Sequence, residues 1–425
     1  MLEVLIPALI ILIGLSLLKV PIYISVFCSA IYLQLFVNHM SLSSLFTGFF
    51  EAMTKNSLLA VPFFMVAGSI IAASSLGTRL INVCIELLKS VRGGLPIACV
   101  IANAIFGAIS GSGPAATATF GKVAFKPLSD HHGESMALGI ITSSACLSTI
   151  IPPSITMIIY GVATETSITQ LFMAGVLPGI FIVIVIGAYL VIRCKRRPGE
   201  ERERFSASGF AKAFWKGIPV LLLPVIVLGS VYTGFCTPTE SGALAAAYSF
   251  VVAVFGTRDI KPRQLLSIFK DSGRTTAQVF LLIAASTVFA QAITVAQVPA
   301  AVTAAFSGMS QVQFLLMLNI LLLIVGCFFD TSAAILILAP ILLPTALGLN
   351  IHPLHLGMVF VVNLAIGLFT PPFGLNIFVA QSVLKRPMGA ISKAVVPFII
   401  LYIICVLVIS YIPALTTTLP TLLLG

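Results

Sequence analysis

The stretch from Thr275 to Leu384 carries a single charged side chain, Asp330. Apolar runs of about 20 residues, the length that crosses the hydrocarbon core of a bilayer, recur along the rest of the sequence. Hydrophobic residues make up 59% of the chain and charged residues only 8%. These features predict an all-α polytopic membrane protein that forms one membrane domain and has no soluble domain.

Other features of the composition fit this class. Eight cysteines are scattered without a Cys-x-x-Cys pair, so neither a disulfide framework nor a zinc site is indicated. The net charge of +10 is better explained by membrane topology than by nucleic acid. The start, MLEVLIPALIILIGLSLLKV, lacks a basic n-region and predicts a retained helix rather than a cleaved signal peptide.

Membrane spans follow from the apolar runs and their polar boundaries. The predicted spans are 4–18, 21–37, 58–76, 136–165, 170–192, 217–234, 238–256, 276–297, 355–384 and 394–416. Two further apolar stretches, 95–126 and 312–345, are interrupted, and we predict that each is a re-entrant helical hairpin that enters and leaves on one side. Every Lys and Arg except Lys55 then falls on the same side. The positive-inside rule makes that side cytoplasmic, with both termini in the periplasm, whereas treating either hairpin as a full span would destroy the asymmetry.

Prolines recur at similar distances in the two halves of the chain. Pro127 and Pro344, near the ends of the two hairpins, are 217 residues apart, and the pairs Pro152-Pro153 and Pro371-Pro372 are 219 residues apart. Each half therefore reads as a hairpin followed by a long span with Pro-Pro in its middle. Chance spacing is the competing explanation, and we disfavour it because the charge pattern points independently to the same division.

Charge places the two hairpins on opposite sides of the membrane. The first is flanked by Arg92, Lys122 and Lys126, whereas the segment from Thr345 to His355 beside the second contains no Lys or Arg. Because an odd number of spans lies between them, we predict inverted repeats with broken helices, the pattern of secondary transporters. The predicted domains are 1–76 (scaffold and partner-binding helices), 77–192 (first repeat), 193–275 (cytoplasmic loop and connecting helices), 276–393 (second repeat) and 394–425 (C-terminal helix).

The hairpin tips and the Pro-Pro breaks carry the groups that a coupling ion needs. Carbonyls and hydroxyls freed at helix breaks suit a hard cation such as Na⁺, and half-helix N-termini suit an anion. The predicted first sodium site comprises Ser110, Gly111, Ser112, Gly113, Thr149, Pro152 and Pro153. The predicted second sodium site comprises Asp330, Thr331, Ser332, Thr370, Pro371, Pro372 and Gly374. The predicted substrate contacts are Ser112, Pro114, Asp330, Thr331 and Asn376.

At these residues the chain resembles the large membrane subunit of the tripartite ATP-independent periplasmic (TRAP) transporters, the DctM-like family. The resemblance rests on SGSGPAAT, TIIPPSITMIIYGVATETSI, LFMAGVLPG, GFCTPTESGALAAAY, DTSAAILILAPILLP and IGLFTPPFGLNIFVA, which occur in the family's order. Many members have S-G-S-x-x-A-D-T in the first motif. This chain has Ala116 at that aspartate and is similar to the S-G-S-G-P-A-T subgroup, which leaves the substrate open.

The resemblance implies a three-component system in the bacterial inner membrane. Its parts would be this subunit, a small four-helix membrane subunit (Q type) and a periplasmic substrate-binding protein (P type). It also implies Na⁺-driven uptake of an organic anion by an elevator movement, with Na⁺ as the coupling ion and no other cofactor. No extra four-helix segment precedes the first span, so we expect the small subunit to be a separate polypeptide.

Several polar residues allow a structural interpretation beside a functional one. Asp330 is a functional candidate because it is an intramembrane carboxylate, and it also qualifies as a helix N-cap; we favour function, since Ser or Asn would cap without the charge. For Glu240 we favour structure, because Thr237 at N-cap and Glu240 at N3 form a capping-box pattern. Asn103 and Asn376 are equally compatible with helix pairing and with a site.

Two other function classes compete with the TRAP permease. The first is a stand-alone sodium/dicarboxylate-type symporter, which would need no binding protein. It stays open because the related divalent-anion/sodium symporters share the inverted hairpin plan. An intramembrane hydrolase is disfavoured, because the chain has no H-E-x-x-H or Walker A motif and all five histidines fall in predicted loops. These histidines are His39, His131, His132, His352 and His355.

The polar segment 193–204 is predicted to be a solvated cytoplasmic loop that sets orientation, with lipid-headgroup binding as the weaker alternative. Sialic acid, C4-dicarboxylates, sugar acids and sulfonates remain candidate substrates.

Overall fold

The computed structural model describes residues 2–194, 205–306 and 308–424, so most of the predicted loop 193–204 lies outside the described residues. The described residues form helices joined by turns, with no strand among them. Nine of the described helical segments are long and apolar enough to cross a membrane, and the protein is a multi-pass membrane protein. They are Asn56–Ala73, Glu134–Thr164, Ile168–Arg193, Ala207–Tyr232, Pro238–Gly256, Arg263–Val295, Gln311–Phe328, Thr331–Gly348 and Met388–Tyr411.

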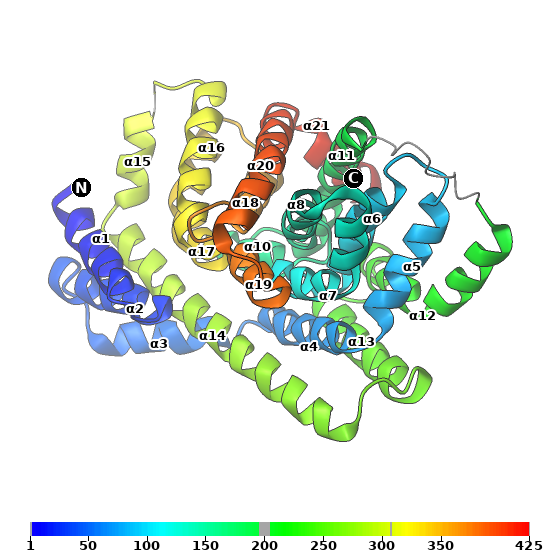
Figure 1. The fold of residues 1–425 in the computed structure, drawn as a ribbon. Coiled ribbons are helices and arrows are strands. Elements are labelled where there is room, and N and C mark those ends of the chain that lie inside the picture. The colour runs from blue at the N-terminus through cyan, green and yellow to red at the C-terminus, as the bar shows by residue number, and fades with distance from the viewer. Residues whose placement is uncertain (1, 195–204, 307, 425) are drawn as a thin grey trace.

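One group of helices includes the long diagonal helix of Figure 1, α14. It comprises α1 (Leu2–Leu17), α2 (Ile22–Tyr32), α3 (Leu42–Met53), α4 (Ala60–Ala73), α5 (Leu76–Leu88), α12 (Ala207–Tyr232), α13 (Pro238–Val251) and α14 (Pro262–Val295). The 34-residue α14 packs against α2, α3 and α4, as the green diagonal in Figure 1 shows. Helix α13 packs on α4, and α12 packs on α5. We call α2, α4 and α14 the scaffold wall, because these three helices share a cavity described below.

Two helix–turn–helix units occupy the positions of the predicted hairpins. The first consists of α6 (Gly94–Ser110) and α7 (Gly113–His132), and the second of α16 (Gln311–Phe328) and α17 (Thr331–Gly348). Gly111 ends α6 with a φ of 57°, a left-handed conformation that glycine adopts without strain. Ser112 then caps α7 by accepting a hydrogen bond from the amide of Ala115, with Pro114 in the first helical turn.

Each unit is followed by a helix interrupted at a Pro-Pro pair, as predicted. The first runs through α8 (Glu134–Ser144), α9 (Leu147–Ile150) and α10 (Ile155–Thr164), and the second through α18 (Pro353–Gly367) and α19 (Leu375–Leu384). These segments lie inside the protein. Residues 354–367 of α18 are all buried, and 89% of an 18-residue apolar stretch within Glu134–Thr164 is buried, against 28% of the corresponding stretch within Ala207–Tyr232. An irregular backbone is tolerated at membrane depth when protein surrounds it, and this burial satisfies that condition.

The remaining helices differ from the predicted spans in length and number. They are α11 (Ile168–Arg193), α15 (Val298–Phe306), α20 (Met388–Tyr411) and α21 (Ala414–Leu424), with one-turn segments at 33–37, 56–59 and 252–256. The predicted span 394–416 is wrong at its end, because the chain breaks before Pro413 and continues as α21. Helices α3, α5 and α15 are not among the predicted spans, and each has at most 13 residues, fewer than the about 20 that cross a bilayer.

The prediction that all five histidines lie in loops is wrong. His355 is buried in α18, where its Nδ1 lies 2.8 Å from Thr416 Oγ1 and its Nε2 lies 3.0 Å from the carbonyl oxygen of Ser410. His131 and His132 form the last turn of α7. The imidazole of His355 can be buried inside the protein because the neighbouring α20 and α21 supply partners for both of its nitrogens.

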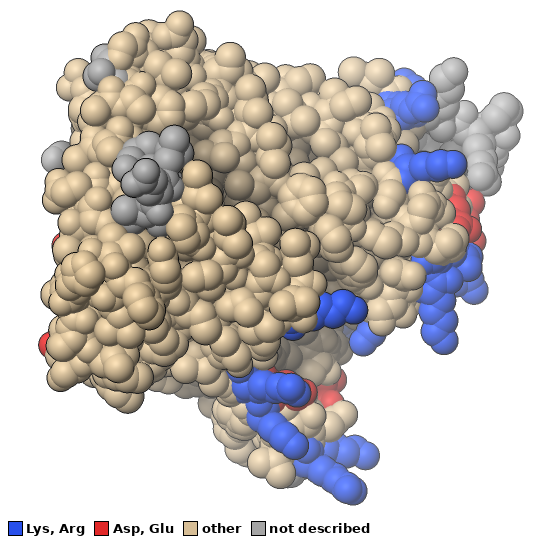
Figure 2. Space-filling model, turned by 90° about the vertical axis from the view of Figure 1, so that its left-hand side faces the viewer, with Lys and Arg blue, Asp and Glu red and all other residues tan. Residues whose placement is uncertain are grey.

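On the face of the molecule that Figure 2 draws, lysine and arginine side chains gather along one margin. Figure 2 shows them at the right and lower edge of this view, next to a broad face with almost no charge. Such segregation is typical of a membrane protein with a basic cytoplasmic side.

Candidate functional site

A cavity of about 580 Å³ lies where both hairpin tips, both interrupted helices and the scaffold wall meet. Its volume is in the usual range of small-molecule sites. It is lined by Pro21, Ile22, Tyr23, Met65, Gly68, Ser69, Ser110, Gly111, Ser112, Gly113, Pro114, Ala115, Thr149, Ile155, Thr156, Thr275, Gln278, Val279, Leu282, Asp330, Thr331, Ser332, Leu368 and Leu375. Asp330 is the only charged residue in this lining, so a bound charge would be met mainly by neutral dipoles.

The first hairpin tip packs directly on the first Pro-Pro break. A Cβ built on Gly111 would lie 3.5 Å from the carbonyl oxygen of Pro153 and 3.2 Å from the amide nitrogen of Ile155. On the opposite side, a Cβ built on Gly68 of α4 would lie 2.7 Å from Ser110 Cα, closer than a side chain allows. The absence of a side chain at both glycines therefore lets the tip fit between the scaffold wall and the break.

Oxygen atoms around this tip keep lone pairs available. Thr149 Oγ1 donates to the carbonyl of Cys146 (2.8 Å), and Ser154 Oγ donates to the carbonyl of Thr149 (2.6 Å). Because a hydroxyl that donates one bond still has two lone pairs, these oxygens can also face a cation. Thr149 lines the cavity, whereas the rings of Pro152 and Pro153 are not part of its wall.

The second hairpin tip brings Asp330, Thr331 and Ser332 to the cavity. Asp330 caps α17, since its Oδ2 accepts a hydrogen bond from the amide of Ser332 (2.9 Å). The predicted cap is therefore present, and the second carboxylate oxygen has no hydrogen-bond partner among the described residues, which leaves it available to the cavity. The rings of Phe328 and Phe373, 5.9 Å apart between centroids, pack this tip against the second break.

The residues of the second break are arranged differently from those of the first. Leu368 and Leu375 flank it and line the cavity, but Thr370, Pro371, Pro372 and Gly374 do not. Two carbonyls at this break are already engaged in backbone hydrogen bonds: the carbonyl of Leu368 accepts from the amide of Asn376 (2.8 Å), and that of Thr370 accepts from the amide of Gly374 (3.1 Å). The predicted second site is thus brought together only in part.

Asn376 lies at the first tip although it follows the second break. Its Nδ2 donates to the carbonyl of Thr142 (3.3 Å), and a Cβ built on Gly113 would lie 3.0 Å from its Oδ1. Asn376 is fully buried, and its Oδ1 has no hydrogen-bond partner among the described residues. An unpaired buried acceptor beside the start of α7 is costly unless a ligand or water meets it.

Three of the polar residues singled out in the sequence have structural partners: Asn103, for which helix pairing and a site were equally compatible, and the predicted capping pair Thr237 and Glu240. Asn103 Nδ2 donates to Ser144 Oγ (2.9 Å) and joins α6 to α8, away from the cavity. Thr237 and Glu240 form the predicted capping box at the start of α13: the amide of Thr237 donates to Glu240 Oε2 (2.8 Å), and the amide of Glu240 donates to Thr237 Oγ1 (3.3 Å).

Sequence reasoning missed the scaffold wall of the cavity. Tyr23, Ser69, Thr275 and Gln278 bring polar side chains to it from α2, α4 and α14. Gln278 could have been recognised from the sequence. It is a polar amide at the third residue of the predicted span 276–297, and a polar side chain inside a span is a candidate for a functional site.

The sequence matches the family model of the tripartite ATP-independent periplasmic transporter, DctM component, over residues 9–415. The chain belongs to this DctM family. It is 40% identical over 387 residues to the C4-dicarboxylate TRAP transporter large permease protein DctM of Pseudomonas aeruginosa, covering 89% of this chain and 90% of that protein. It is 37% identical over 370 residues to the isethionate TRAP transporter permease protein DctMQ of Oleidesulfovibrio alaskensis, covering 86% of this chain and 58% of that longer protein.

A solved structure has the same general fold as this DctM-family chain. The YdaH transporter of Alcanivorax borkumensis aligns with a TM-score of 0.61 at 14% identity, covering 88% of each chain. The named relatives are transporter permeases and not enzymes, so this chain is a transporter permease too. The predicted sodium and substrate residues stay predictions, because the comparisons assign no residue a role.

Proposed function

We propose that the protein is the permease subunit of a Na⁺-coupled, binding-protein-dependent transporter that imports an organic anion across the inner membrane. The cavity between both hairpin tips and the scaffold wall is the observation that carries this proposal. Helix breaks in transporters meet where ions and substrates bind. The relatives named for C4-dicarboxylate and for isethionate support a carboxylate or sulfonate, and a sugar acid fits the same class.

The proposed architecture is a pair of inverted repeats that moves as an elevator. Residues 77–192 and 276–393 would form the repeats, each a hairpin followed by an interrupted helix, and the scaffold would comprise 1–76 and 193–275, with 394–425 as a C-terminal addition. The repeated order of elements and the basic margin in Figure 2 support this arrangement. In the predicted topology, Tyr23 and Thr275 lie close to the cytoplasmic Lys19 and Arg274, so the cavity would face the cytoplasm here.

Coupling to Na⁺ fits the oxygen-rich surroundings of the tips. The proposed first site uses Ser110, Ser112, Thr149 and carbonyls near Pro152, and it is supported by the contact of Gly111 with Pro153. The proposed second site uses Asp330, Thr331 and Ser332, together with carbonyls near Thr370 and Pro371. Support for its break residues is weaker, because two of the carbonyls there already accept backbone hydrogen bonds.

The anionic group of the substrate would bind at the start of α7. The partial positive charge of a helix N-terminus favours an anion, and no acidic side chain lies in the first turn of α7. Pro114 has no amide proton and the amides of Ala115 and Ala116 already donate to Ser112, so the anion would be met mainly by the helix dipole and the amide of Gly113. Ser112 and Pro114 line the cavity at this end, and the predicted substrate contact Asn376 lies beside Gly113, outside the lining. At α17 the carboxylate of Asp330 already offsets the same partial charge, so that end suits a cation better.

The proposal includes two partners. The name DctMQ of the longer isethionate relative supports a small membrane subunit of the Q type, and membership of a periplasmic transporter family supports a binding protein. In this proposal both termini face the periplasm.

Reconstitution tests the proposal directly. The chain, co-expressed with a small membrane subunit and a binding protein from the same genome, is placed in liposomes with K⁺ inside and either Na⁺ or K⁺ outside. We expect uptake of radiolabelled succinate or isethionate only with Na⁺ and only with all components. Equal uptake in K⁺ would contradict Na⁺ coupling. Uptake without the binding protein would support the stand-alone symporter instead.

A further inference from the structure

The scaffold wall of the cavity carries two polar side chains without partners. Tyr23 at the start of α2 and Gln278 in α14 both line the cavity. Two neighbours on the same wall are already engaged: Ser69 Oγ accepts from Ser272 Oγ (3.1 Å), and Thr275 Oγ1 donates to the carbonyl of Asp271 (3.0 Å). In contrast, neither the Tyr23 hydroxyl nor the Gln278 amide bonds to any residue that the structure describes.

The position of the Gln278 amide is unusual for a membrane helix. Gln278 is exposed, and it stands at the start of the apolar run VFLLIAAS of α14. Turned toward lipid, an unpaired amide would cost several kcal/mol, whereas a water-filled cavity solvates it. Such a solvated donor is available to a ligand that displaces the water.

The two walls of the cavity offer different chemistry. The hairpin tips offer a helix N-terminus for one anionic group, as argued above. The scaffold wall has no Lys or Arg among the described lining residues, and its available donors are the O–H of Tyr23 and the N–H groups of Gln278. Oxygens of a carboxylate, sulfonate or hydroxyl accept from both.

We propose that Tyr23 and Gln278 are specificity-determining residues that bind the second oxygen-bearing group of a bifunctional organic anion. The first anionic group sits at the hairpin tips, and the second, a carboxylate or hydroxyl at the other end of the molecule, faces the scaffold wall. This inference rests on the proposed transport function. Tyr23 and Gln278 would thereby favour succinate-like diacids and hydroxysulfonates over monoacids with an apolar tail.

Ligand-dependent thermal stabilisation of the purified full chain in Na⁺ tests the inference, because a ligand stabilises the folded state according to its Kd. Two matched pairs of probes are titrated: succinate against butyrate, and isethionate against ethanesulfonate. In each pair the second compound lacks the second oxygen-bearing group. For the wild type we expect tighter binding of succinate or of isethionate than of its partner compound.

The variants are Gln278→Leu and Tyr23→Phe, with Gln291→Leu on α14 and Tyr32→Phe on α2 as controls outside the cavity lining. We expect Gln278→Leu to raise the Kd of the bifunctional probe about tenfold and Tyr23→Phe about fivefold, the size of one hydrogen bond. The Kd of the matched monofunctional compound should stay the same, as should the ligand-free melting temperature. Gln278→Glu should weaken binding further, because it sets a second negative charge against the anion.

The possible outcomes distinguish a failure of this inference from a failure of the proposed function. Binding by the wild type with unchanged Kd in both variants overturns this inference and leaves the proposed function standing. Equal weakening of both compounds in a pair also overturns it, because the effect would then be structural. If no probe stabilises the wild type in Na⁺, the proposed substrate class fails, and this inference fails with it.

Discussion

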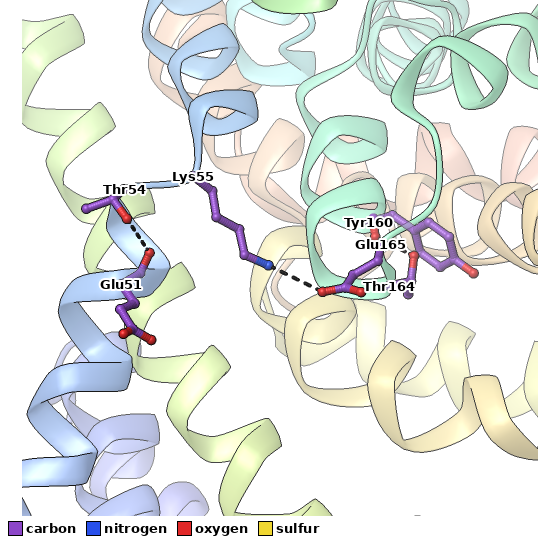
Figure 3. A network of polar contacts seen from close by, with 6 residues as sticks. All are labelled: Glu51, Thr54, Lys55, Tyr160, Thr164 and Glu165. Carbon is purple, nitrogen blue, oxygen red and sulfur yellow. Dashed lines mark hydrogen bonds and ion pairs between the residues drawn. The ribbon is translucent and has the colours of Figure 1, made fainter.

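The Nζ atom of Lys55 lies 3.8 Å from Oε1 of Glu165, an ion pair that joins the turn before α4 to the end of α10. Figure 3 shows the lysine side chain reaching across from its own segment toward the other. Glu165 has a φ of 56° and ends its helix, and Thr164 beside it donates to the carbonyl of Tyr160 (2.7 Å). The pair therefore connects the segment that leads into the scaffold wall to the first interrupted helix.

This ion pair should affect transport more than stability. Its side chains are 43% and 86% exposed, and exposed pairs contribute about 0–1 kcal/mol. We expect Lys55→Ala and Glu165→Ala to leave the melting temperature unchanged. Either should change the uptake rate by up to about fivefold, because 1 kcal/mol is enough to shift an equilibrium between two arrangements that much. The exchange Lys55→Glu with Glu165→Lys should restore uptake, and 0.5 M salt should reduce the difference from wild type. Unfolding of a single variant would contradict this assignment.

Asp330 is expected to serve transport beyond its role as a cap. Asp330→Asn should retain the melting temperature and the membrane abundance, because Asn accepts the same hydrogen bond from Ser332. It should lower Na⁺-dependent uptake at least about tenfold, since about 1.4 kcal/mol of lost cation binding suffices for that. Asp330→Ala should also lose about 1 kcal/mol of stability with the cap. If the Asn variant transports like the wild type while the Ala variant is poorly expressed, Asp330 is only a cap.

Asp259 gives the protein a pH-dependent contact outside the membrane spans. Its Oδ2 accepts from the amide of Ser75 (3.0 Å) and from Ser75 Oγ at the start of α5, with Arg79 nearby. Partial burial alone would raise the pKa of Asp259, but the hydrogen bonds from Ser75 and Thr257 and the charge of Arg79 together hold it below its ordinary value. A carboxyl with a lowered folded-state pKa stabilises above its unfolded value near 3.8 and loses that contribution as the pH falls through the folded value.

Asp259→Asn should therefore destabilise the protein at pH 7 and make little difference at low pH. The expected loss at neutral pH is about 1 kcal/mol, after allowance for solvent screening at this partly exposed site. Melting curves of both proteins at a series of pH values from 7 down to about 2 measure it, because the contribution of the charge is lost only below the ordinary pKa of 3.8. A difference that stays constant over the whole series would show that the charge of Asp259 does not matter.

The sequence predicts those parts of the fold that depend on local chemistry. Gly111, Pro114 and the Pro-Pro pairs fix where helices end and begin, so both helix–turn–helix units and both breaks were placed correctly from residue type alone. Long-range packing is different. Nothing in the sequence near Asn376 indicates that it would lie on Gly113, because that contact depends on how α19 packs against α7 and α8.

The same limit explains the missed scaffold wall. Tyr23 and Gln278 lie far from the hairpin tips in the sequence, and only the packing of α2, α4 and α14 brings them to one cavity. His355 was misplaced for a related reason, because its partners Ser410 and Thr416 come from later helices. A polar residue in an apolar chain is easily recognised, but its partner is a property of the fold.

A pair of glycines on α16 and α18 should respond unequally to the same substitution. A Cβ built on Gly367 would lie 2.2 Å from the carbonyl oxygen of Gly326, so the two helices would have to separate. A Cβ built on Gly326 would have its closest contact at 3.4 Å, which is ordinary packing. One turn before Gly367, Asn363 Nδ2 donates to Asn319 Oδ1 (2.7 Å), and separation of the helices would strain this buried bond too.

We therefore expect Gly367→Ala to destabilise the protein by about 3 kcal/mol or more, combining overpacking with a weakened buried hydrogen bond. Gly326→Ala should be neutral within about 1 kcal/mol, because the methyl group fits and alanine favours a helix. Gly187→Ala in α11, where nothing lies within 4 Å of the added carbon, controls for helix propensity alone. Melting temperature and the monodisperse fraction after detergent extraction measure all three variants. Equal losses in Gly326→Ala and Gly367→Ala would contradict the one-sided contact, because the backbone of Gly326 occupies the space that a side chain at 367 would need, whereas a side chain at 326 meets only ordinary contacts.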